Sequence, residues 1–396
     1  MAPWGVLLWM RSTTGQVPPA PRPAATLRST SPSPTEITPL HRGPWGELEY
    51  SRILIEPPEE FITANYTKPD AIHWVFKNYS ESSLATLWEN AGLTATQRAF
   101  LAAPSHRQVT SEAIIILPGR DFIIGLSPES RGKIYTSLAE FPENSAQYEP
   151  YRLRNDAVPQ WFDDSGLSAE TIALTKRMLY HRANSAFFSD DEIILPMLSA
   201  STERIKYIKT LSRKSALIVQ LRVRSDTDID SVARYWGRGR RSKDLRPLLQ
   251  SLARRPDGGM IDIVHLLPPF ARSMLYTYPL PSENPTDASH DCHWSSFNFL
   301  KSTPDERFAN IEFVKQTLLN DYYPVPGEPK LGDLLVMVTP TGVVVHSCVY
   351  IADNIVFTKN GPGFSVPWML APLDDVVAFY SIGPRLEVRH YRAKDD

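Results

Sequence analysis

The sequence predicts an α+β protein, and three observations favour this class. Helix-start signals followed by helical spacing of apolar residues recur between Trp45 and Pro281. Apolar runs rich in β-branched residues, which are typical of strands, lie among these helices. The last third of the chain has one amphipathic helix and then a meander of short strands. Antiparallel strands and short helices therefore make up the predicted fold.

Length and composition limit the kinds of protein that this chain can be. At 396 residues it exceeds one usual compact core, so we expect two folded domains and some unfolded sequence. Hydrophobic residues make up 42% and charged residues 22%, as in ordinary soluble globular proteins. The net charge of -2 gives no overall field for nucleic acid, and we interpret the basic run at 238–246 as a solvated surface. No stretch approaches the roughly 18 apolar residues of a membrane span.

Residues 1–44 are predicted to be a disordered leader. They are crowded with Pro, Ser and Thr and show neither a helical nor a strand period. Proline removes backbone donors, and the few apolar residues cannot bury enough surface to offset the entropy of ordering. The opening "MAPWGVLLWM" is a weak secretion signal, because no basic residue precedes it and no small-residue cleavage site follows. The sequence therefore leaves the localisation open.

Residues 45–281 are predicted to form a mixed domain with many short helices, whose role the sequence leaves open. Thr94 with Gln97 forms a capping-box pattern, Ser127 precedes Pro128 at a first helical turn, and Ser168 opens another helix. The predicted strands are "AIIIL" from Ala113 and "SALIVQLRV" from Ser215. Several large side chains could line a groove, but aromatic residues at helical spacing favour core packing. These residues are Trp74, Trp88, Arg131, Tyr135, Tyr180 and Trp236.

Cys292 is the first candidate for chemistry. The chain has only two cysteines, so no framework of several disulfides supports the fold. The segment "HDCHWSSFNFL" predicts a turn that enters a helix at Cys292. A thiol at a helix start faces unpaired backbone donors and the positive end of the helix dipole, and both favour the thiolate. The same amides could bind a developing oxyanion. The alternative is a small buried hydrophobic residue, although Cys292 has polar neighbours.

His346 is the second candidate, and it lies in a predicted antiparallel meander. The runs "LLVMV", "VVVHSCVYI" and "IVFT" read as three strands joined by turns. Strand alternation places His346 and Cys348 on one face and Ser347 on the other. A lone strand histidine is usually a core residue. Because a helix-start cysteine precedes it, His346 becomes a candidate base for that thiol.

These residues resemble the NlpC-type cell-wall cysteine peptidases and amidases, a compact branch of the papain-like fold. In that family an Asp-Cys pair opens the core helix, as Asp291 and Cys292 do here. A Gly-Asp-Leu turn then opens the sheet, as Gly332 and the next two residues do, and a histidine follows one strand later, at His346. The gap of 346 − 292 = 54 residues is also like this branch. The resemblance covers about residues 282–380.

The resemblance implies a papain-like domain at 282–396, with a helix packed on an antiparallel sheet. It implies hydrolysis of an amide bond in a peptide or peptidoglycan stem peptide through an acyl-enzyme, in an extracytoplasmic or cell-wall setting. No metal or other cofactor is needed for this chemistry. The chain departs from the family at His293 and Trp294, where the family usually has Ser-Gly, and we expect these bulkier residues to reshape the cleft mouth. Asp291 and His293 are possible supporting residues.

The family's third polar residue, which orients the histidine, lies about a dozen positions further along. Counting from His346 reaches Thr358, and Asn360 shares its face of the predicted strand. An amide oxygen accepts from an imidazole N–H better than a threonine hydroxyl does. We therefore predict Asn360 as the third catalytic position, with Thr358 as the alternative.

Four other interpretations stay open at this point. A thioester acyltransferase would use the same intermediate, and a non-enzymatic binding module could use the same scaffold. Cys292, His293, His346 and Cys348 have the ligand types of a zinc site, but not the usual spacing. A disulfide between the two cysteines would remove the reactive thiol. The oligomeric state cannot be derived from the sequence.

Overall fold

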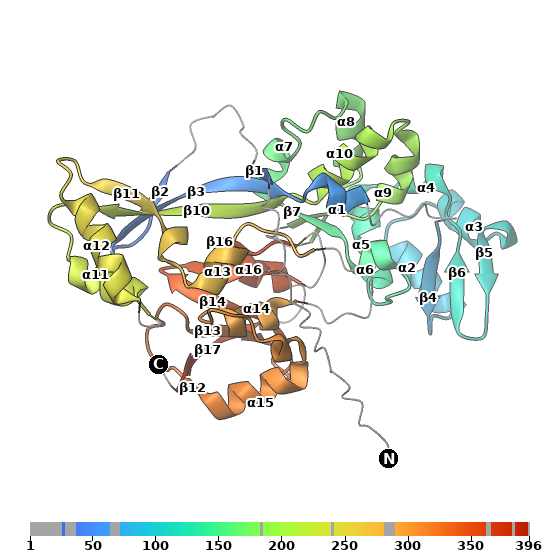
Figure 1. The fold of residues 1–396 in the computed structure, drawn as a ribbon. Helices are drawn as coiled ribbons and strands as arrows, with labels where there is room; N and C mark the ends of the chain where they lie inside the picture. Colours follow the sequence, from blue (N-terminus) through green and yellow to red (C-terminus); the bar gives the residue numbers. More distant parts are fainter. Residues whose placement is uncertain are drawn as a thin grey trace, which may run out of the picture.

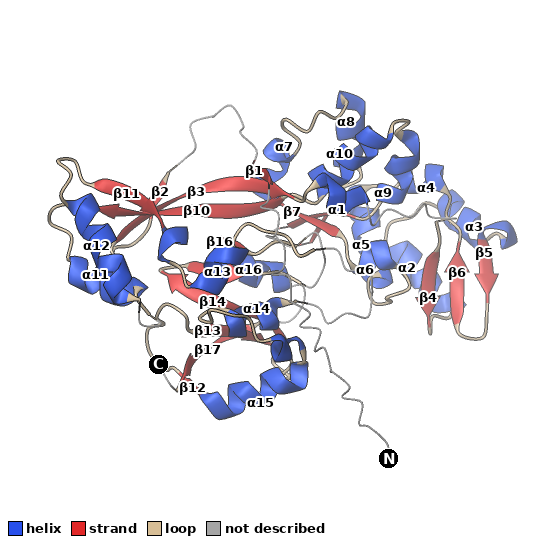
Figure 2. Ribbon diagram, in the orientation of Figure 1, coloured by secondary structure: helices blue, strands red, loops and turns tan. Residues whose placement is uncertain are grey.

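The computed structural model describes residues 37–63, 72–182, 185–238, 241–280, 290–361, 366–381 and 385–394, and the backbone of 26–27. The strands in these segments form four sheets whose neighbouring strands pair antiparallel, with short helices around them (Figures 1 and 2). The predicted α+β class is therefore confirmed. Within the described residues, no helix is long and apolar enough to cross a membrane.

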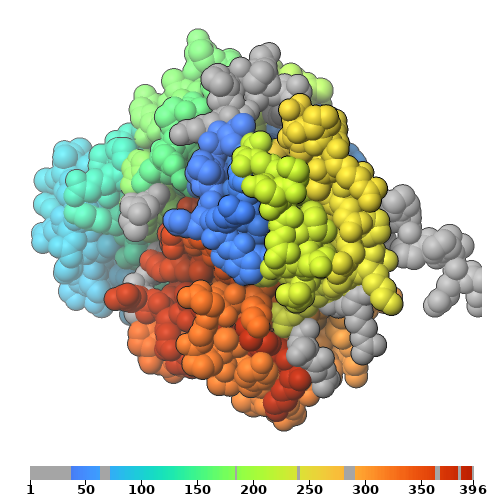
Figure 3. All heavy atoms as spheres, turned by 90° about the vertical axis from the view of Figure 1, so that its left-hand side faces the viewer, coloured from blue at the N-terminus to red at the C-terminus, as the bar shows by residue number. Residues whose placement is uncertain are grey.

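A long two-stranded ribbon forms the axis of the molecule. β3 (Glu47–Glu56) pairs with β10 (Lys214–Val223) along almost its whole length. β11 (Gly259–Asp262) extends the sheet on the other side of β10. Figure 3 shows the blue β3 segment beside the yellow-green segment that contains β10, above the orange and red C-terminal third. Strands distant in sequence are thus neighbours.

Part of the predicted leader belongs to this sheet. β1 (Thr26–Leu27) and β2 (Thr38–Pro39) both pair antiparallel with β3. The prediction of disorder is wrong for these strands, because hydrogen bonds to an open strand edge offset the cost of ordering them. Pro39 has no N–H to donate, which suits an edge position. Residues 1–25 and 28–36, with the weak secretion signal, lie outside the described residues.

Between β3 and β10 the chain forms a separate unit, which we call the inserted body (residues 72–211), cyan to green in Figure 1. Its predicted helix starts are confirmed, because the side chains of Thr94, Ser127 and Ser168 each accept a first-turn N–H. The short helix α1 (Glu59–Thr63) leads into it. Its helices are α2 (Glu81–Asn90), α3 (Ala95–Ala102), α4 (Arg120–Ile124), α5 (Pro128–Leu138), α6 (Ser145–Tyr148), α7 (Val158–Trp161), α8 (Ala169–Arg177), α9 (Asp191–Ile194) and α10 (Ser201–Leu211). Its strands are β4 (Trp74–Lys77), β5 (Arg107–Val109), β6 (Ala113–Ile116), β7 (Tyr151–Arg154), β8 (Tyr180–Arg182) and β9 (Ser185–Phe188).

The large side chains considered for a groove are buried instead. Trp74, Arg131, Tyr135 and Tyr180 are fully buried in the inserted body, and Trp88 is nearly so. Trp236 is buried in the core beside the ribbon. The core-packing interpretation is therefore confirmed.

The C-terminal third forms a six-stranded sheet with the order β12-β17-β13-β14-β15-β16. The predicted meander is confirmed as its three strands β13 (Leu334–Val338), β14 (Val344–Ala352) and β15 (Ile355–Thr358). The remaining strands are β12 (Tyr322–Pro324), β16 (Met369–Pro372) and β17 (Glu387–Ala393). The helices after β10 are α11 (Ile229–Trp236), α12 (Ser242–Ala253), α13 (Pro269–Met274), α14 (Cys292–Asn298), α15 (Ile311–Asp321) and α16 (Leu373–Tyr380).

Each face of this sheet has its own core. On one face Trp294 of α14 packs with Val349 and Phe357, in a cluster that also contains Trp236. On the other face Cys348 packs in a second cluster that includes residues of the ribbon. The first core contains residues from both sides of residue 281, so the predicted division there does not coincide with a gap in the hydrophobic core.

Two residues of the basic run also hold the fold together. Arg238 donates to the backbone oxygen of Leu331 and to the buried carboxylate of Asp333, which also accepts from Arg392. Arg241 donates to two backbone oxygens, those of residues 266 and 267. The solvated-surface interpretation is wrong for these two arginines, because their guanidinium groups donate to buried backbone and carboxylate oxygens.

Candidate active site

Cys292 is the first residue of helix α14, as the sequence predicts. The helix begins here because the Asp291 carboxylate accepts the Trp294 N–H at 2.9 Å. The Ser295 hydroxyl adds a hydrogen bond of 2.6 Å to the Asp291 carbonyl oxygen. Asp291 thus acts as the helix cap that sets the position of the thiol.

Strand β14 holds Cys292 through the residue beside His346. The pairing of β14 with β15 ends at Val349 and Phe357. Ser347, two residues before Val349, is therefore not paired with β15. A backbone hydrogen bond from Ser347 reaches the Cys292 thiol, and the Ser347 hydroxyl contacts the Cys292 carbonyl oxygen at 3.4 Å. The same hydroxyl lies 2.9 Å from Nδ1 of His293. The end of the β14–β15 pairing therefore makes room for the start of α14.

His346 is fully buried and its ring is fixed on two sides. Its Nε2 atom lies 3.0 Å from the Thr358 hydroxyl. The ring of Tyr380, at the end of α16, stacks on it with 4.3 Å between centroids and 20° between planes. The Nδ1 atom of His346 is buried and has no hydrogen-bond partner.

The hydrogen-bond directions define the tautomer of His346. The Thr358 hydroxyl donates its single proton to Oδ1 of Asn360 at 2.8 Å. It can therefore only accept from His346, which places the ring proton on Nε2. Nδ1 is then left with a lone pair, which is the state that a proton acceptor needs.

The direct partner of His346 is thus Thr358, and Asn360 lies one hydrogen bond further away. The choice of Asn360 as the direct acceptor is wrong, because strand β15 ends at Thr358 and the backbone departs from the strand path before Asn360. Asn360 still joins the chain of hydrogen bonds. It holds the Thr358 hydroxyl in the orientation that accepts from the ring.

Burial keeps both Cys292 and His346 neutral in this arrangement. Burial raises the pKa of the Cys292 thiol to about 12, and the Asp291 charge acts in the same direction. Burial also lowers the pKa of His346 to about 3, with His293 as a second cause. The helix start was expected to favour the thiolate, but desolvation outweighs the first turn of a helix of seven residues.

Trp294 and His293, the two residues after Cys292, both contact neighbouring side chains. Trp294 is fully buried between the rings of His290 and Phe270, whose centroids lie at 3.8 and 5.1 Å. Nδ1 of His293 forms a hydrogen bond with the Ser347 hydroxyl. The expectation that Trp294 reshapes the cleft mouth is therefore wrong, since its ring belongs to the core.

The proposed zinc ligands do not form one group in the described part of the chain. Asp291, Cys292 and His293 have potential ligand atoms within 4.8 Å of one another, but His346 and Cys348 are not in this group. The Asp291 carboxylate already caps α14, and Nδ1 of His293 contacts Ser347. This set does not fit the four-coordinate zinc site that was considered. Both cysteines are free thiols.

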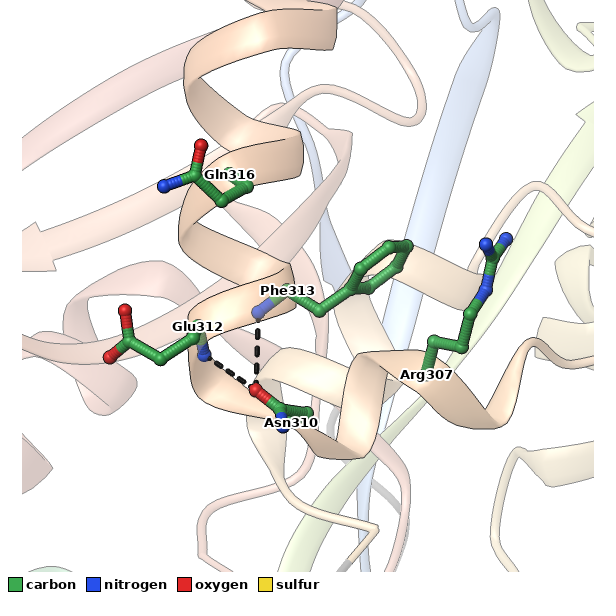
Figure 4. Close-up of a pocket in the computed structure, with 5 residues that line it drawn as sticks. All are labelled: Arg307, Asn310, Glu312, Phe313 and Gln316. Atoms are coloured by element: carbon green, nitrogen blue, oxygen red, sulfur yellow. Dashed lines mark hydrogen bonds between the residues drawn. The ribbon is translucent and has the colours of Figure 1, made fainter.

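An open hollow beside α15 is lined by other residues (Figure 4). Asn310 caps α15 there by accepting the N–H groups of Glu312 and Phe313 at 2.9 and 3.2 Å. The Arg307 guanidinium lies 4.6 Å from the centre of the Phe313 ring. None of the predicted site residues lines this hollow, and its Asn310 side chain serves the helix cap.

Several neighbours of the thiol were missed by the sequence reasoning. Ser347 could have been found from its place next to His346. Tyr380 and Lys359 carry no local sequence signal, because tertiary packing alone brings them to Cys292. Comparisons of the chain with protein-family models, with curated proteins and with solved structures find no match.

Proposed function

We propose that this protein is a cysteine-nucleophile amide hydrolase with a papain-like site. Cys292 is the nucleophile, His346 is the base, and Thr358 with Asn360 fixes the imidazole. The observation that carries the proposal is the unpaired, buried Nδ1 of His346 on a ring whose other nitrogen is held by Thr358. A buried acceptor without a partner is costly, so the unpaired Nδ1 favours a role in proton transfer, and Ser347, the residue next to His346, contacts Cys292.

The arrangement supports a two-step reaction. The Cys292 thiol passes its proton to Nδ1 of His346, and the sulfur attacks the substrate carbonyl carbon. The N–H groups of Trp294 and Ser295 are already bonded to Asp291, so the N–H of Cys292 is the donor that we propose for a developing oxyanion. The imidazolium then gives its proton to the leaving amine, and an acyl-enzyme remains on the sulfur. Water attacks this thioester, with His346 again as the base, and the carboxylic acid and free thiol are released.

The architecture and the resemblance suggest the substrate class. A helix that starts with the nucleophile and packs on an antiparallel sheet is consistent with the NlpC-like branch of the papain-like fold. That branch acts on peptides and peptidoglycan stem peptides, so we propose a peptide amide bond of this kind and an extracytoplasmic site of action. The inserted body is an addition to such a domain.

The test is direct detection of the acyl-enzyme. Full-length protein is incubated with a panel of peptides and stem peptides, quenched, digested and analysed by mass spectrometry of the Cys292 peptide. We expect an acyl adduct in the wild type and none in Cys292→Ala. Loss of His346 in His346→Ala should slow acylation by about a thousandfold or more, because the proton acceptor is removed.

The outcomes separate the alternatives. Product that forms only after addition of a second amine would indicate an acyltransferase. If no peptide acylates the wild type, and an electrophilic cysteine-protease probe labels wild type and His346→Ala equally, the site is not a hydrolase site. Thermal melts of both variants show whether the fold is retained.

A further inference from the structure

Lys359 is a buried amine next to the proposed site. It follows Thr358 directly at the end of β15 and is fully buried. Transferring an ammonium group from water into a protein interior is expensive unless nearby groups compensate its charge. The groups around Lys359 therefore indicate which role its ammonium charge has.

The amine lies over the ring of Trp368, which is hydrogen-bonded to the first turn of helix α14. Its Nζ atom donates to the carbonyl oxygen of Gly361 at 2.5 Å and lies 5.5 Å from the centre of the Trp368 ring. The indole N–H of Trp368 donates to the Ser295 hydroxyl at 2.7 Å, and that hydroxyl donates to the carbonyl of Asp291. One aromatic ring thus connects the amine with the first turn that carries Cys292.

The charge of Lys359 acts on the thiol. Burial lowers the pKa of Lys359 to about 7, whereas Cys292 and Asp291 stabilise its charged form. In return, the Lys359 charge lowers the pKa of the Cys292 thiol, against the effects of burial and of the Asp291 charge. The titratable groups around the thiol come from four elements. They are Asp291, which caps α14, His293 of α14, Cys348 of β14, Lys359 after β15, and Tyr380 of α16, while His346 of β14 faces His293.

We propose that the ammonium group of Lys359 is the buried cation that stabilises the thiolate of Cys292 when the nucleophile forms. This inference rests on the proposed function, since it takes Cys292 as the nucleophile. Transfer of the thiol proton to Nδ1 of His346 creates a thiolate and an imidazolium in a dry site. The protonated form of Lys359, which a pKa of about 7 leaves partly populated at neutral pH, lowers the cost of the new negative charge. Lys359 thus acts on the reaction through Cys292.

The first experiment measures the alkylation rate of Cys292 by iodoacetamide between pH 5 and 10, read by mass spectrometry of the Cys292 peptide. Lys359→Met keeps a long apolar side chain and removes the charge. We expect alkylation at pH 7 to slow by roughly tenfold or more, with the profile moved to higher pH, since one unit of pKa corresponds to a tenfold change in thiolate. Lys359→Arg keeps the charge and should restore most of the rate.

Lys133→Met is the matched control. Lys133 is exposed on α5 of the inserted body, so this variant removes the same net charge without touching the site. Its alkylation profile should overlay that of the wild type. A folded Lys359→Met protein with the wild-type profile would overturn the proposal, as would equal slowing by Lys133→Met.

A second measurement keeps the proposal testable if Lys359→Met does not fold. Coupling between two charges is reciprocal, so Cys292→Asp, which can carry a negative charge at this position, should raise the titration midpoint of the Lys359 amine relative to Cys292→Ala, followed by NMR of lysine labelled at Nζ. An identical midpoint in both proteins would contradict the proposal. Both experiments are independent of turnover. Failure to hydrolyse any amide would refute the proposed function while leaving the effect of Lys359 on the thiol measurable.

Discussion

The inserted body and the C-terminal sheet both bury ionisable groups, but the two regions differ in how these groups are paired. In the inserted body Nε of Arg131 lies 3.0 Å from Oδ2 of Asp190, and both side chains are almost completely buried. The hydroxyl of Tyr135 donates to the same carboxylate. Each charge there faces an opposite charge, although Nη1 of Arg131 has no hydrogen-bond partner in the described part of the chain.

Cys292 and His346 do not form a corresponding ion pair. Burial drives the thiol and the imidazole to their neutral forms, and Nδ1 of His346 lacks a partner. This is the difference that the proposed function predicts between a structural group and a reactive one. A compensated ion pair serves the fold, whereas groups whose charges appear together only after a proton moves are suited to chemistry.

The largest effect is expected in the inserted body. Arg131→Met leaves the Asp190 carboxylate buried without its cation, and we expect the free energy of unfolding to fall by about 3–5 kcal/mol. Urea denaturation followed by circular dichroism measures this loss. The alkylation rate of Cys292 in the folded protein should not change, because Arg131 belongs to the other core.

Lys133→Met in the same helix is the control for this prediction. Lys133 pairs with Glu129 at 2.9 Å, and both side chains are exposed. Its loss should cost no more than about 0.5 kcal/mol. Equal losses in the two variants would mean that the buried pair has no special role in the inserted body.

The features that the sequence predicted are those that depend on neighbouring residues. The caps at Thr94 and Ser168 need only a side chain and an amide three positions away, so their helices begin where expected. The strand that carries His346 follows from apolar alternation and β-branched residues. The helix start at Cys292 follows from the Asp291 cap in the same way.

The features that could not be predicted depend on contacts between distant segments. The pairing of β3 with β10 makes residues 72–211 an insertion, and no local pattern signals this pairing. Thr358 replaces Asn360 at the histidine because of where β15 ends. Lys359 and Tyr380 reach the thiol only after the sheet and α16 have packed.

A smaller effect is expected from the neutral state of His346. Its pKa is lowered to about 3 by burial, below the ordinary value of 6.5. Between these values the unfolded chain binds a proton that the folded chain does not, so stability falls as the pH falls through this window. The unfolding free energy of the wild type should therefore decrease relative to His346→Gln by up to about 1.4 kcal/mol per pH unit below pH 6.5.

The measurement is a series of urea denaturation curves for both proteins between pH 4 and 8. Above pH 6.5 the difference between the two unfolding free energies should be constant. A difference that stays constant down to pH 4 would show that His346 is protonated as easily in the folded protein as in the unfolded chain. Unchanged urea slopes would confirm that both proteins unfold from the same compact state.

The smallest effects separate Thr358 from Asn360. Thr358→Val keeps the shape of the side chain but removes the hydroxyl oxygen that accepts from Nε2 of His346. The ring proton can then move to Nδ1, where it blocks uptake of the thiol proton, so we expect acylation to slow about tenfold to a hundredfold. Asn360→Ala leaves the Thr358 hydroxyl in place but lets it rotate. Because the correct tautomer is then only less favoured, the loss should be about threefold.

Single-turnover acylation of Cys292 measures both variants, and Thr358→Ser, which keeps the hydroxyl, is the control that should retain most of the rate. The order of the two effects tests the relay directly. If the ring proton is held on Nε2 by Thr358, and Asn360 only orients that hydroxyl, damage must decrease along the chain of hydrogen bonds away from His346. A larger loss in Asn360→Ala than in Thr358→Val would mean that the amide reaches the imidazole itself during acylation, so that Asn360 is the principal acceptor.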